Sequence, residues 1–212
     1  MNPRWMTENC GSYMSKAYVG VNDTARNVKS IYAGVEGTAR KIIRAYAGVN
    51  GLARMIFESV KETAVSIPVM TSNTAPSGTA SAVSEYSANA MAWKAFDGND
   101  TTQWSSQSGT KSVTGSAWIQ YDFGYAVRPT LMTYKVSGNY RAKTYSLLGS
   151  NDGSEFTELS AGTLPNSSDT MTVTLNVNRR YRFFRLVLTN KYTASARFFV
   201  AVFGIDGFAV ES

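Results

Sequence analysis

The sequence predicts an all-β protein in two parts, a short repeat region followed by a larger β-sandwich domain. Three similar copies of a nine-residue motif occur near the N-terminus, starting at Tyr18, Tyr32 and Tyr46. From about Ser66 onward the composition shifts toward Ser, Thr, Asn and Gly, and short alternating strands follow with turn signals between them. Strands at this regular spacing are typical of a two-layer β-sandwich.

The composition is that of a globular protein. The chain has 212 residues, of which 43% are hydrophobic and 17% charged, which is enough for one ordinary domain and a smaller one. The formal net charge is +6, and residues 1–62 carry 9 Lys and Arg against 5 Asp and Glu, so most of the basic excess lies in the repeats. These basic residues recur once per repeat and are not clustered with stacking aromatic residues. We therefore expect no nucleic acid partner.

The residues that most often carry catalysis are scarce. The chain contains one cysteine, Cys10, and no histidine. A single cysteine excludes an intrachain disulfide, and the lack of histidine removes the commonest general base and the commonest metal ligand. Acidic residues are scattered, and no glycine-rich phosphate loop occurs. We therefore expect no enzyme activity and no catalytic residues.

Residues 1–16 are polar and irregular, and we expect them to form an N-terminal arm, either a docking arm or a loose terminus. They contain no apolar run of signal-peptide length. No segment of the chain approaches roughly 18 consecutive apolar residues. The sequence thus predicts neither export through a signal peptide nor membrane insertion, and its first residue, Met1, indicates a natural start.

Residues 17–58 contain the repeats, and each repeat carries a turn signal. Asn50-Gly51 favours a tight hairpin because both residues accept positive φ angles, and Glu36-Gly37 and Asn22-Asp23 occupy the equivalent places. The simplest interpretation is a small antiparallel meander of about four strands. If the Glu36-Gly37 loop has two residues, Ile31 lies opposite Ile42 and Ala33 opposite Arg40.

A sheet of this size cannot hide its own apolar face and open edges. A 14-residue unit must therefore stack on its neighbours or on another chain. We expect the repeat region to be an assembly element that docks onto other proteins or onto further copies of the chain.

Residues 59–65 are expected to be a linker, and residues 66–212 to form the sandwich domain. Asn151-Asp152-Gly153 is a turn signal within this domain. The strand candidates are Ala117–Phe123, Lys143–Leu148, Thr170–Leu175, Tyr181–Leu188 and Phe198–Phe203.

Four segments of this domain resemble, in order, the motifs of discoidin-like domains, which are also called coagulation-factor C-type or galactose-binding-like domains. The segments are Ala95–Ser106, Trp118–Gly124, Tyr145–Gly153 and Tyr181–Leu188. The resemblance implies an eight-stranded jelly-roll sandwich, in agreement with the strand pattern above. It also implies that several aromatic residues belong to the core, namely Phe96, Trp104, Trp118, Phe123 and Phe184.

The resemblance also implies a structural calcium site. In carbohydrate-binding relatives the first motif often encloses Ca²⁺ with carboxylate, hydroxyl and backbone oxygens. The matching ligands here are the side chains of Asp97 and Thr102 and the backbone oxygens near Ala95 and Asn99. The family commonly adds a Glu from the last strand, where this chain has Gly204. The alternative is that Asp97 caps a tight turn through its own backbone.

Relatives of this family bind ligands with loops at one end of the sandwich. A sugar site needs an aromatic ring for the C–H surface of the sugar and planar polar groups for its hydroxyls. The binding His that relatives often carry is absent, which argues against galactose itself. The candidate ligand-binding residues lie in an early, a middle and a late loop: Tyr86, Trp93, Asn139, Tyr140, Arg141 and Tyr192.

The repeats resemble short repeats in tail and baseplate proteins of bacteriophages and prophages from Gram-positive bacteria. This implies a virion protein of the tail, baseplate or fibre, made in the host cytoplasm and released without a signal peptide. Its partners would be other virion proteins, further copies in a homo-oligomer such as a trimer, and host cell-wall glycans, with a role in receptor binding and host attachment. One alternative is a structural decoration or adaptor protein of the head or tail without a glycan ligand. Another is a binding module that serves a separate enzyme.

Overall fold

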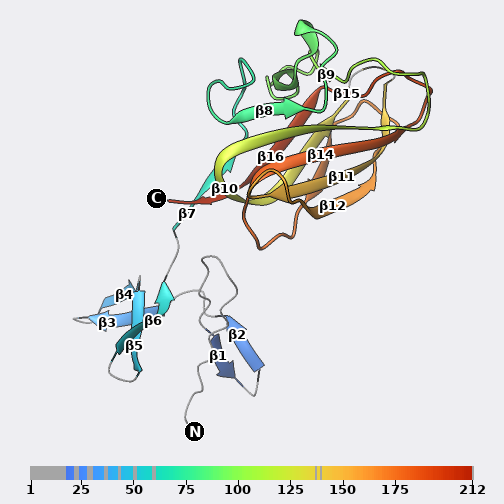
Figure 1. Cartoon of the computed structure of the whole chain (residues 1–212). Coiled ribbons are helices and arrows are strands. Elements are labelled where there is room, and N and C mark those ends of the chain that lie inside the picture. The colour runs from blue at the N-terminus through green and yellow to red at the C-terminus, as the bar shows by residue number, and fades with distance from the viewer. Residues whose placement is uncertain are drawn as a thin grey trace. The chain divides into compact units, whose positions relative to one another are not determined.

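The computed structural model describes the backbone of residues 18–21, 24–27, 31–35, 38–42, 44–49 and 52–58, and residues 61–211 except 137 and 139. The chain divides into two compact units, with the boundary between Lys61 and Glu62. Figure 1 shows small paired strands in the first unit and a β-sandwich in the second. The arm expected at residues 1–16 lies outside the described residues, as do residues 59 and 60 of the expected linker. No helix in the described part of the chain is long and apolar enough to cross a membrane.

The strands of the repeat region pair as antiparallel hairpins, one for each repeat. They are β1 (Tyr18–Val21) with β2 (Thr24–Asn27), β3 (Ile31–Val35) with β4 (Thr38–Ile42), and β5 (Arg44–Val49) with β6 (Leu52–Glu58). In each hairpin two residues separate the paired strands, at the places where the sequence has its turn signals.

The register within a hairpin follows the sequence prediction. Ile31 pairs with Ile42 and Ala33 with Arg40, as a two-residue loop requires. Within the described residues, however, each hairpin forms its own two-stranded sheet, which corrects the expectation of one four-stranded meander. The reason is that a tight turn fixes the pairing of the two strands beside it, whereas it places no constraint on pairing between successive hairpins.

The sandwich begins inside the segment that was expected to be a linker. Strand β7 (Glu62–Ser66) pairs antiparallel with β16 (Val202–Val210), the last strand of the chain. Residues 62–65 are therefore part of an edge strand. This strand is short and polar, so its own residues do not predict a strand. It can be recognised only from its pairing with β16.

The longest strand, β10 (Ser116–Lys135), belongs to both layers of the sandwich. Its first half pairs with β8 (Thr79–Ala82) and β14 (Tyr181–Lys191). Its second half pairs with β16 and with β13 (Met171–Thr174). Sequence reasoning found only the first of these halves.

A bend at Gly124 lets β10 change layers. The register with β14 is interrupted between Asp122 and Val127. Gly124 has a φ of +79°, a conformation that glycine adopts without steric cost, and its N–H donates to Asp122 Oδ1 at 2.7 Å. The local sequence thus encodes the crossing from one layer to the other.

The remaining strands complete the two layers. β11 (Ala142–Ser150) lies between β14 and β12 (Thr157–Thr163), so one layer has the order β8-β10-β14-β11-β12 and the other β13-β10-β16-β7. The turn predicted at 151–153 connects β11 to β12, and Asp152 Oδ1 accepts the N–H groups of Ser154 and Glu155 there. These backbone N–H groups hold the pKa of Asp152 well below its usual range. Two short strands, β9 (Trp104–Ser105) and β15 (Phe199–Val200), and two 3-10 helices, η1 (Ala88–Ala90) and η2 (Ala92–Ala95), lie outside these layers.

The core fills the space between the layers with aromatic and branched side chains. Phe96 contacts Tyr121 of β10 at a ring-centroid distance of 5.5 Å and Phe203 of β16 at 5.6 Å, so it bridges both layers. Trp104 and Phe184 are completely buried, and Trp104 Nε1 donates to the backbone oxygen of Ser84 at 2.9 Å. The predicted core positions at Phe96, Trp104, Phe123 and Phe184 are confirmed.

The predicted core position at Trp118 is wrong. Trp118 alternates with the buried Ala117 and Ile119 on β10, so its side chain lies on the outer face of the sheet and is only partly buried. The guanidinium of Arg185 lies 4.2 Å from its ring centre and also stacks on Phe156 at 3.9 Å. Trp118 is thus half of an aromatic clamp around an arginine.

Candidate functional site

At one end of the sandwich, two loop segments form a small two-stranded sheet, which we call the floor. β9 and β15 pair antiparallel there, with Phe199 opposite Ser105, and Figure 1 shows them at the same end as the 3-10 helices. The backbone N–H of Tyr86 donates to the oxygen of Ser105 at 2.9 Å, which fixes a third segment beside the floor. The floor is therefore supported by backbone hydrogen bonds.

Two exposed tyrosines, one arginine and one phenylalanine lie in a row on this floor. The Tyr140 ring contacts the Phe199 ring at a centroid distance of 4.2 Å. The guanidinium carbon of Arg197 lies 5.9 Å from the Phe199 ring centre and 3.7 Å from the Tyr86 ring centre. Tyr86 is 48% and Tyr140 39% exposed, whereas Phe199 is 9% exposed. We call these four residues the aromatic surface.

The guanidinium of Arg197 is the polar centre of the aromatic surface. Among the described residues it has no hydrogen bond or ion pair, and its contacts are the rings of Tyr86 and Phe199. Stacking on aromatic faces holds an arginine in a defined plane and leaves its N–H groups at the edge. Such a group can donate to a sugar hydroxyl, a carboxylate or a phosphate.

Of the predicted ligand-binding residues, Tyr86 and Tyr140 belong to the aromatic surface, and Asn139 lies outside the described residues. Arg141 is directed elsewhere: it donates to Ser168 Oγ at 3.0 Å and to Asn166 Oδ1 at 3.4 Å. Tyr192 donates its hydroxyl to the backbone oxygen of Leu164 at 2.6 Å. These two side chains therefore anchor the neighbouring 164–168 loop.

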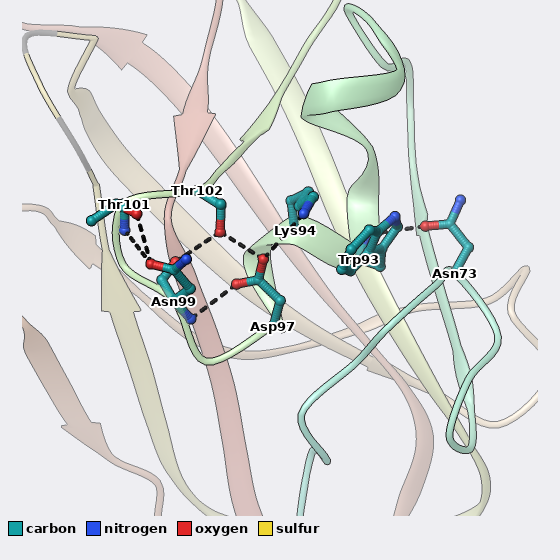
Figure 2. A network of polar contacts seen from close by, with 7 residues as sticks. All are labelled: Asn73, Trp93, Lys94, Asp97, Asn99, Thr101 and Thr102. Atoms are coloured by element: carbon teal, nitrogen blue, oxygen red, sulfur yellow. Dashed lines mark hydrogen bonds and ion pairs between the residues drawn. The ribbon is translucent and has the colours of Figure 1, made fainter.

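Trp93 also lies apart from the aromatic surface. It is in η2, packs against the core, and donates its backbone N–H to Asn73 Oδ1 at 3.0 Å. Lys94 places its Nζ 3.9 Å from the Trp93 ring centre, so one face of that ring is covered by an ammonium group. Figure 2 shows Trp93 between Asn73 and Lys94.

The predicted calcium ligands lie in a turn closed by its own hydrogen bonds (Figure 2). Asp97 Oδ1 accepts the N–H of Asn99 at 3.0 Å, and Asp97 Oδ2 accepts the hydroxyl of Thr102 at 2.6 Å. The hydroxyl of Thr102 also lies 2.9 Å from the backbone oxygen of Asn99, while Asn99 Oδ1 accepts from Thr101. Lys94 Nζ lies 3.7 Å from Asp97 Oδ2.

These oxygens are of the kind that calcium prefers, but they include a single carboxylate. The described part of the chain contains no group of three or more Asp, Glu, His or Cys side chains arranged to hold a metal. Ala95 is buried at the end of η2. The turn fits the capping alternative given above, since the hydrogen bonds of Asp97 stay within residues 97–102.

A hollow of about 460 Å³ lies away from the aromatic surface. Its lining comes from the second half of β10 and from the end of β13 with the loop that follows. Arg128 lines it, but this side chain already pairs with Glu62 at 2.7 Å. We place the candidate site at the aromatic surface, because that surface presents exposed rings together with a guanidinium that is unpaired among the described residues.

Residues 79–199 match the family model described as the F5/8 type C domain. The chain belongs to this family. The match runs from β8 to the first residue of β15 and includes all four residues of the aromatic surface. A search of curated proteins found no significant match.

Several solved structures share the fold of this F5/8 type C domain. The family 32 carbohydrate-binding module of Clostridium perfringens NanJ, in complex with galactose, is 21% identical with a TM-score of 0.55, over 68% of this chain and 99% of that one. A family 32 module of a C. perfringens family 89 protein, in complex with GalNAc-β-1,3-galactose, is 23% identical with a TM-score of 0.52, over 60% and 94%. A variant of chitosan-binding module 1 from a Paenibacillus sp. IK-5 chitosanase/glucanase is 25% identical with a TM-score of 0.53, over 64% and 98%.

Sequence reasoning missed two members of the aromatic surface, Arg197 and Phe199. The sequence pattern predicts one strand over Phe198–Phe203, whereas this segment contains β15, a break at Ala201, and the start of β16. A signal was present, because Arg197 and Phe199 are two residues apart and would share a face in extended backbone. It could not be separated from an ordinary strand pattern without knowing where the strand breaks.

Proposed function

We propose that this F5/8 type C domain is a non-catalytic glycan-binding module and that the aromatic surface is its site. The observation that carries the proposal is the row Tyr140, Phe199, Arg197 and Tyr86, with two exposed rings and an unpaired guanidinium between them among the described residues. Sugar rings offer an apolar C–H face and equatorial hydroxyls, which match aromatic faces and N–H donors. The solved relatives that are named as carbohydrate-binding modules support the same class of ligand.

The aromatic surface is shallow, so each copy of the domain should bind weakly. Deep pockets bury most of a ligand's surface, whereas an open row of rings covers one face of it. We expect single-site dissociation constants in roughly the micromolar to millimolar range. Several copies held together would raise the effective affinity by roughly 10²–10⁴.

The test is binding of the full chain to a panel of immobilised polysaccharides and purified bacterial cell walls. Replacing both exposed rings, Tyr86→Ala with Tyr140→Ala, should reduce binding at least about tenfold while the melting temperature changes little, since neither ring is buried. Tyr125→Ala is the matched control, because Tyr125 is 49% exposed and lies outside the aromatic surface. Loss of binding in the control alone, or undiminished binding in the double variant, would contradict the proposal.

We further propose that the repeats hold the chain in a bacteriophage virion, with the domain directed at host cell-surface glycans. Support comes from the three hairpins, one per repeat, and from the resemblance of the repeats to those of phage tail and baseplate proteins. Mass spectrometry of purified particles induced from the host should detect the chain at a stoichiometric level. Particles that lack it would favour a module that acts beside a separate enzyme. Particles that retain it but adsorb normally with the double tyrosine variant would favour the structural alternative.

A further inference from the structure

We infer that the ligand of the aromatic surface is an acidic glycan, one that carries carboxylate or phosphate groups. This rests on the proposed function and names the chemical class of its ligand. The juxtaposition that supports it is Arg197 stacked on Tyr86, beside Phe199, with no acidic partner among the described residues.

Stacking on Tyr86 holds the guanidinium of Arg197 in an orientation that can bind an anion. A guanidinium held flat against an aromatic ring keeps its N–H groups in one plane, and the fork of two N–H donors matches the two oxygens of a carboxylate or phosphate. Several other arginines of the described residues have polar partners within the fold. Arg182 pairs with Asp122 at 2.7 Å, and Arg128 pairs with Glu62. Arg185, which is also stacked on aromatic rings, donates its Nε–H to Gln120 Oε1 at 2.9 Å.

Two charged side chains that neighbour the segments of the aromatic surface are held by other contacts. Lys191 is 6% exposed, and its Nζ lies over the ring of Phe198, the residue between Arg197 and Phe199, at 4.4 Å. Among the described residues it has no ion-pair partner. Glu85, the acidic neighbour of Tyr86 in sequence, is turned away, since its Oε1 accepts the backbone N–H of Ala92 at 2.7 Å.

A neutral sugar would use only part of this arrangement. Its hydroxyls can accept single hydrogen bonds from Arg197, whereas a carboxylate or phosphate adds a charge-assisted pair of bonds that is about twice as strong. The attraction also falls with ionic strength when the charges are exposed. An acidic glycan should therefore bind more tightly than a matched neutral glycan, and its affinity should fall more steeply as salt is added.

The experiment compares matched polymers for binding to the full chain by biolayer interferometry. The pairs are polygalacturonate against its carboxyl-reduced form, and Gram-positive cell walls before and after removal of phosphate polymers with hydrofluoric acid. We expect at least one acidic member to bind about tenfold or more tightly than its neutral partner, with the preference falling as salt is raised. The pair that shows the preference identifies carboxylate or phosphate as the anion.

Variants of Arg197 test whether its positive charge causes the preference for acidic polymers. Arg197→Gln should remove the preference and leave the weak neutral binding, and Arg197→Lys should retain part of it. Arg179→Gln, an exposed arginine outside the aromatic surface, is the control and should change nothing. Equal binding of both members of each pair would overturn the acidic ligand while leaving glycan binding intact. No binding to any member, acidic or neutral, would overturn the proposed function as well.

The turn at Asp97 supports a second, independent inference: we propose that the Lys94 ammonium supplies the positive charge there and that the domain needs no calcium. The Asp97 side chain is 8% exposed, and its Oδ2 lies 3.7 Å from Lys94 Nζ, which is itself held over the Trp93 ring. A dication bound to Asp97 Oδ2 would lie within a few ångströms of this ammonium, and the two would repel each other. Figure 2 shows Lys94 directed toward the carboxylate.

The test is thermal unfolding of the full chain in calcium chloride and in EGTA. The melting temperature of the sandwich should be the same in both, whereas a bound ion would raise it. Lys94→Met keeps the length of the side chain but leaves Asp97 without its cation, and it should lower the melting temperature by about 2–4 °C. Lys111→Met, at an exposed lysine, should leave it unchanged. A rise of the parent's melting temperature in calcium, or an unchanged one in Lys94→Met, would overturn this inference.

Discussion

Trp104 and Trp118 lie 14 positions apart in neighbouring motifs, yet the structure buries only Trp104 completely. Trp118 is partly exposed on the outer face of β10, where it stacks on Arg185. The two tryptophans therefore contribute to stability through different contacts: Trp104 fills the core, and Trp118 covers an arginine.

Replacing each tryptophan by alanine should separate these roles. Trp104→Ala should cost about 3–5 kcal/mol, as expected for a large cavity in the core. Trp118→Ala should cost about 1–2 kcal/mol, because it removes partial burial and one cation–π contact. Chemical denaturation of the full chain, following the sandwich transition, measures both. Equal losses would show that Trp118 has the core role that its motif predicted.

Residue types in the motifs were enough to predict most of the core, but not the face on which a side chain lies. Phe96, Phe123 and Phe184 were assigned correctly from the family pattern. Trp118 was not, because its position next to the buried Ile119 decides its orientation. Similarly, the sequence placed Tyr86 and Tyr140 among the candidate ligand-binding residues, whereas their link through Arg197 and Phe199 depends on contacts between loops far apart in sequence.

Strand β7 depends on an ion-pair cluster as well as on its hydrogen bonds to β16. Glu62 in β7 pairs with Arg128 of β10 and with Arg180, the residue before β14. The hydrogen bond from Arg128, together with the positive charges of both arginines, holds the pKa of Glu62 below its usual range. Glu62 therefore joins the edge strand to both layers of the sandwich.

The lowered pKa of Glu62 predicts a pH-dependent contribution to stability. The carboxylate stabilises the fold above its unfolded-state pKa of about 4.5, and this contribution is lost as the pH falls through the lower folded-state pKa. Glu62→Gln should thus cost about 1–2 kcal/mol at pH 7, and the difference from the parent should shrink below about pH 4. Urea titrations at several pH values measure it, with the exposed Glu158→Gln as control. A difference that stays constant with pH would show that the ion pairs contribute nothing.

At the scale of elements, prediction succeeded where structure is local. The pairing of Ile31 with Ile42 followed from two turn residues, and the turn at 151–153 followed from Asn-Asp-Gly. It failed where pairing is between distant segments. The short strands β7, β8 and β12 were missed or assigned to a linker because their sequences are polar, and their partners lie far along the chain.

At the scale of the whole molecule, the repeats and the domain have complementary roles in the proposed function. A weak single site becomes effective when several copies act together, and the hairpins of the repeat region offer strand edges for such assembly. The chain as a whole should therefore sediment as an oligomer of its 23.1 kDa mass. Analytical ultracentrifugation measures this, and a monomer at micromolar concentration would show that copies assemble only on another protein or do not assemble.

The central claim is that a glycan lies on Tyr86 and Tyr140, and contacts between sugar and ring protons test it most directly. The measurement is an intermolecular NOE experiment on the full chain with an oligosaccharide fragment of the polymer that binds best. The account predicts NOEs from sugar C–H protons to the rings of Tyr140 and Tyr86, with those to the Tyr140 ring lost in Tyr140→Ala. NOEs to the Trp118 face instead, or no NOE to either tyrosine from a sugar that binds, would contradict it.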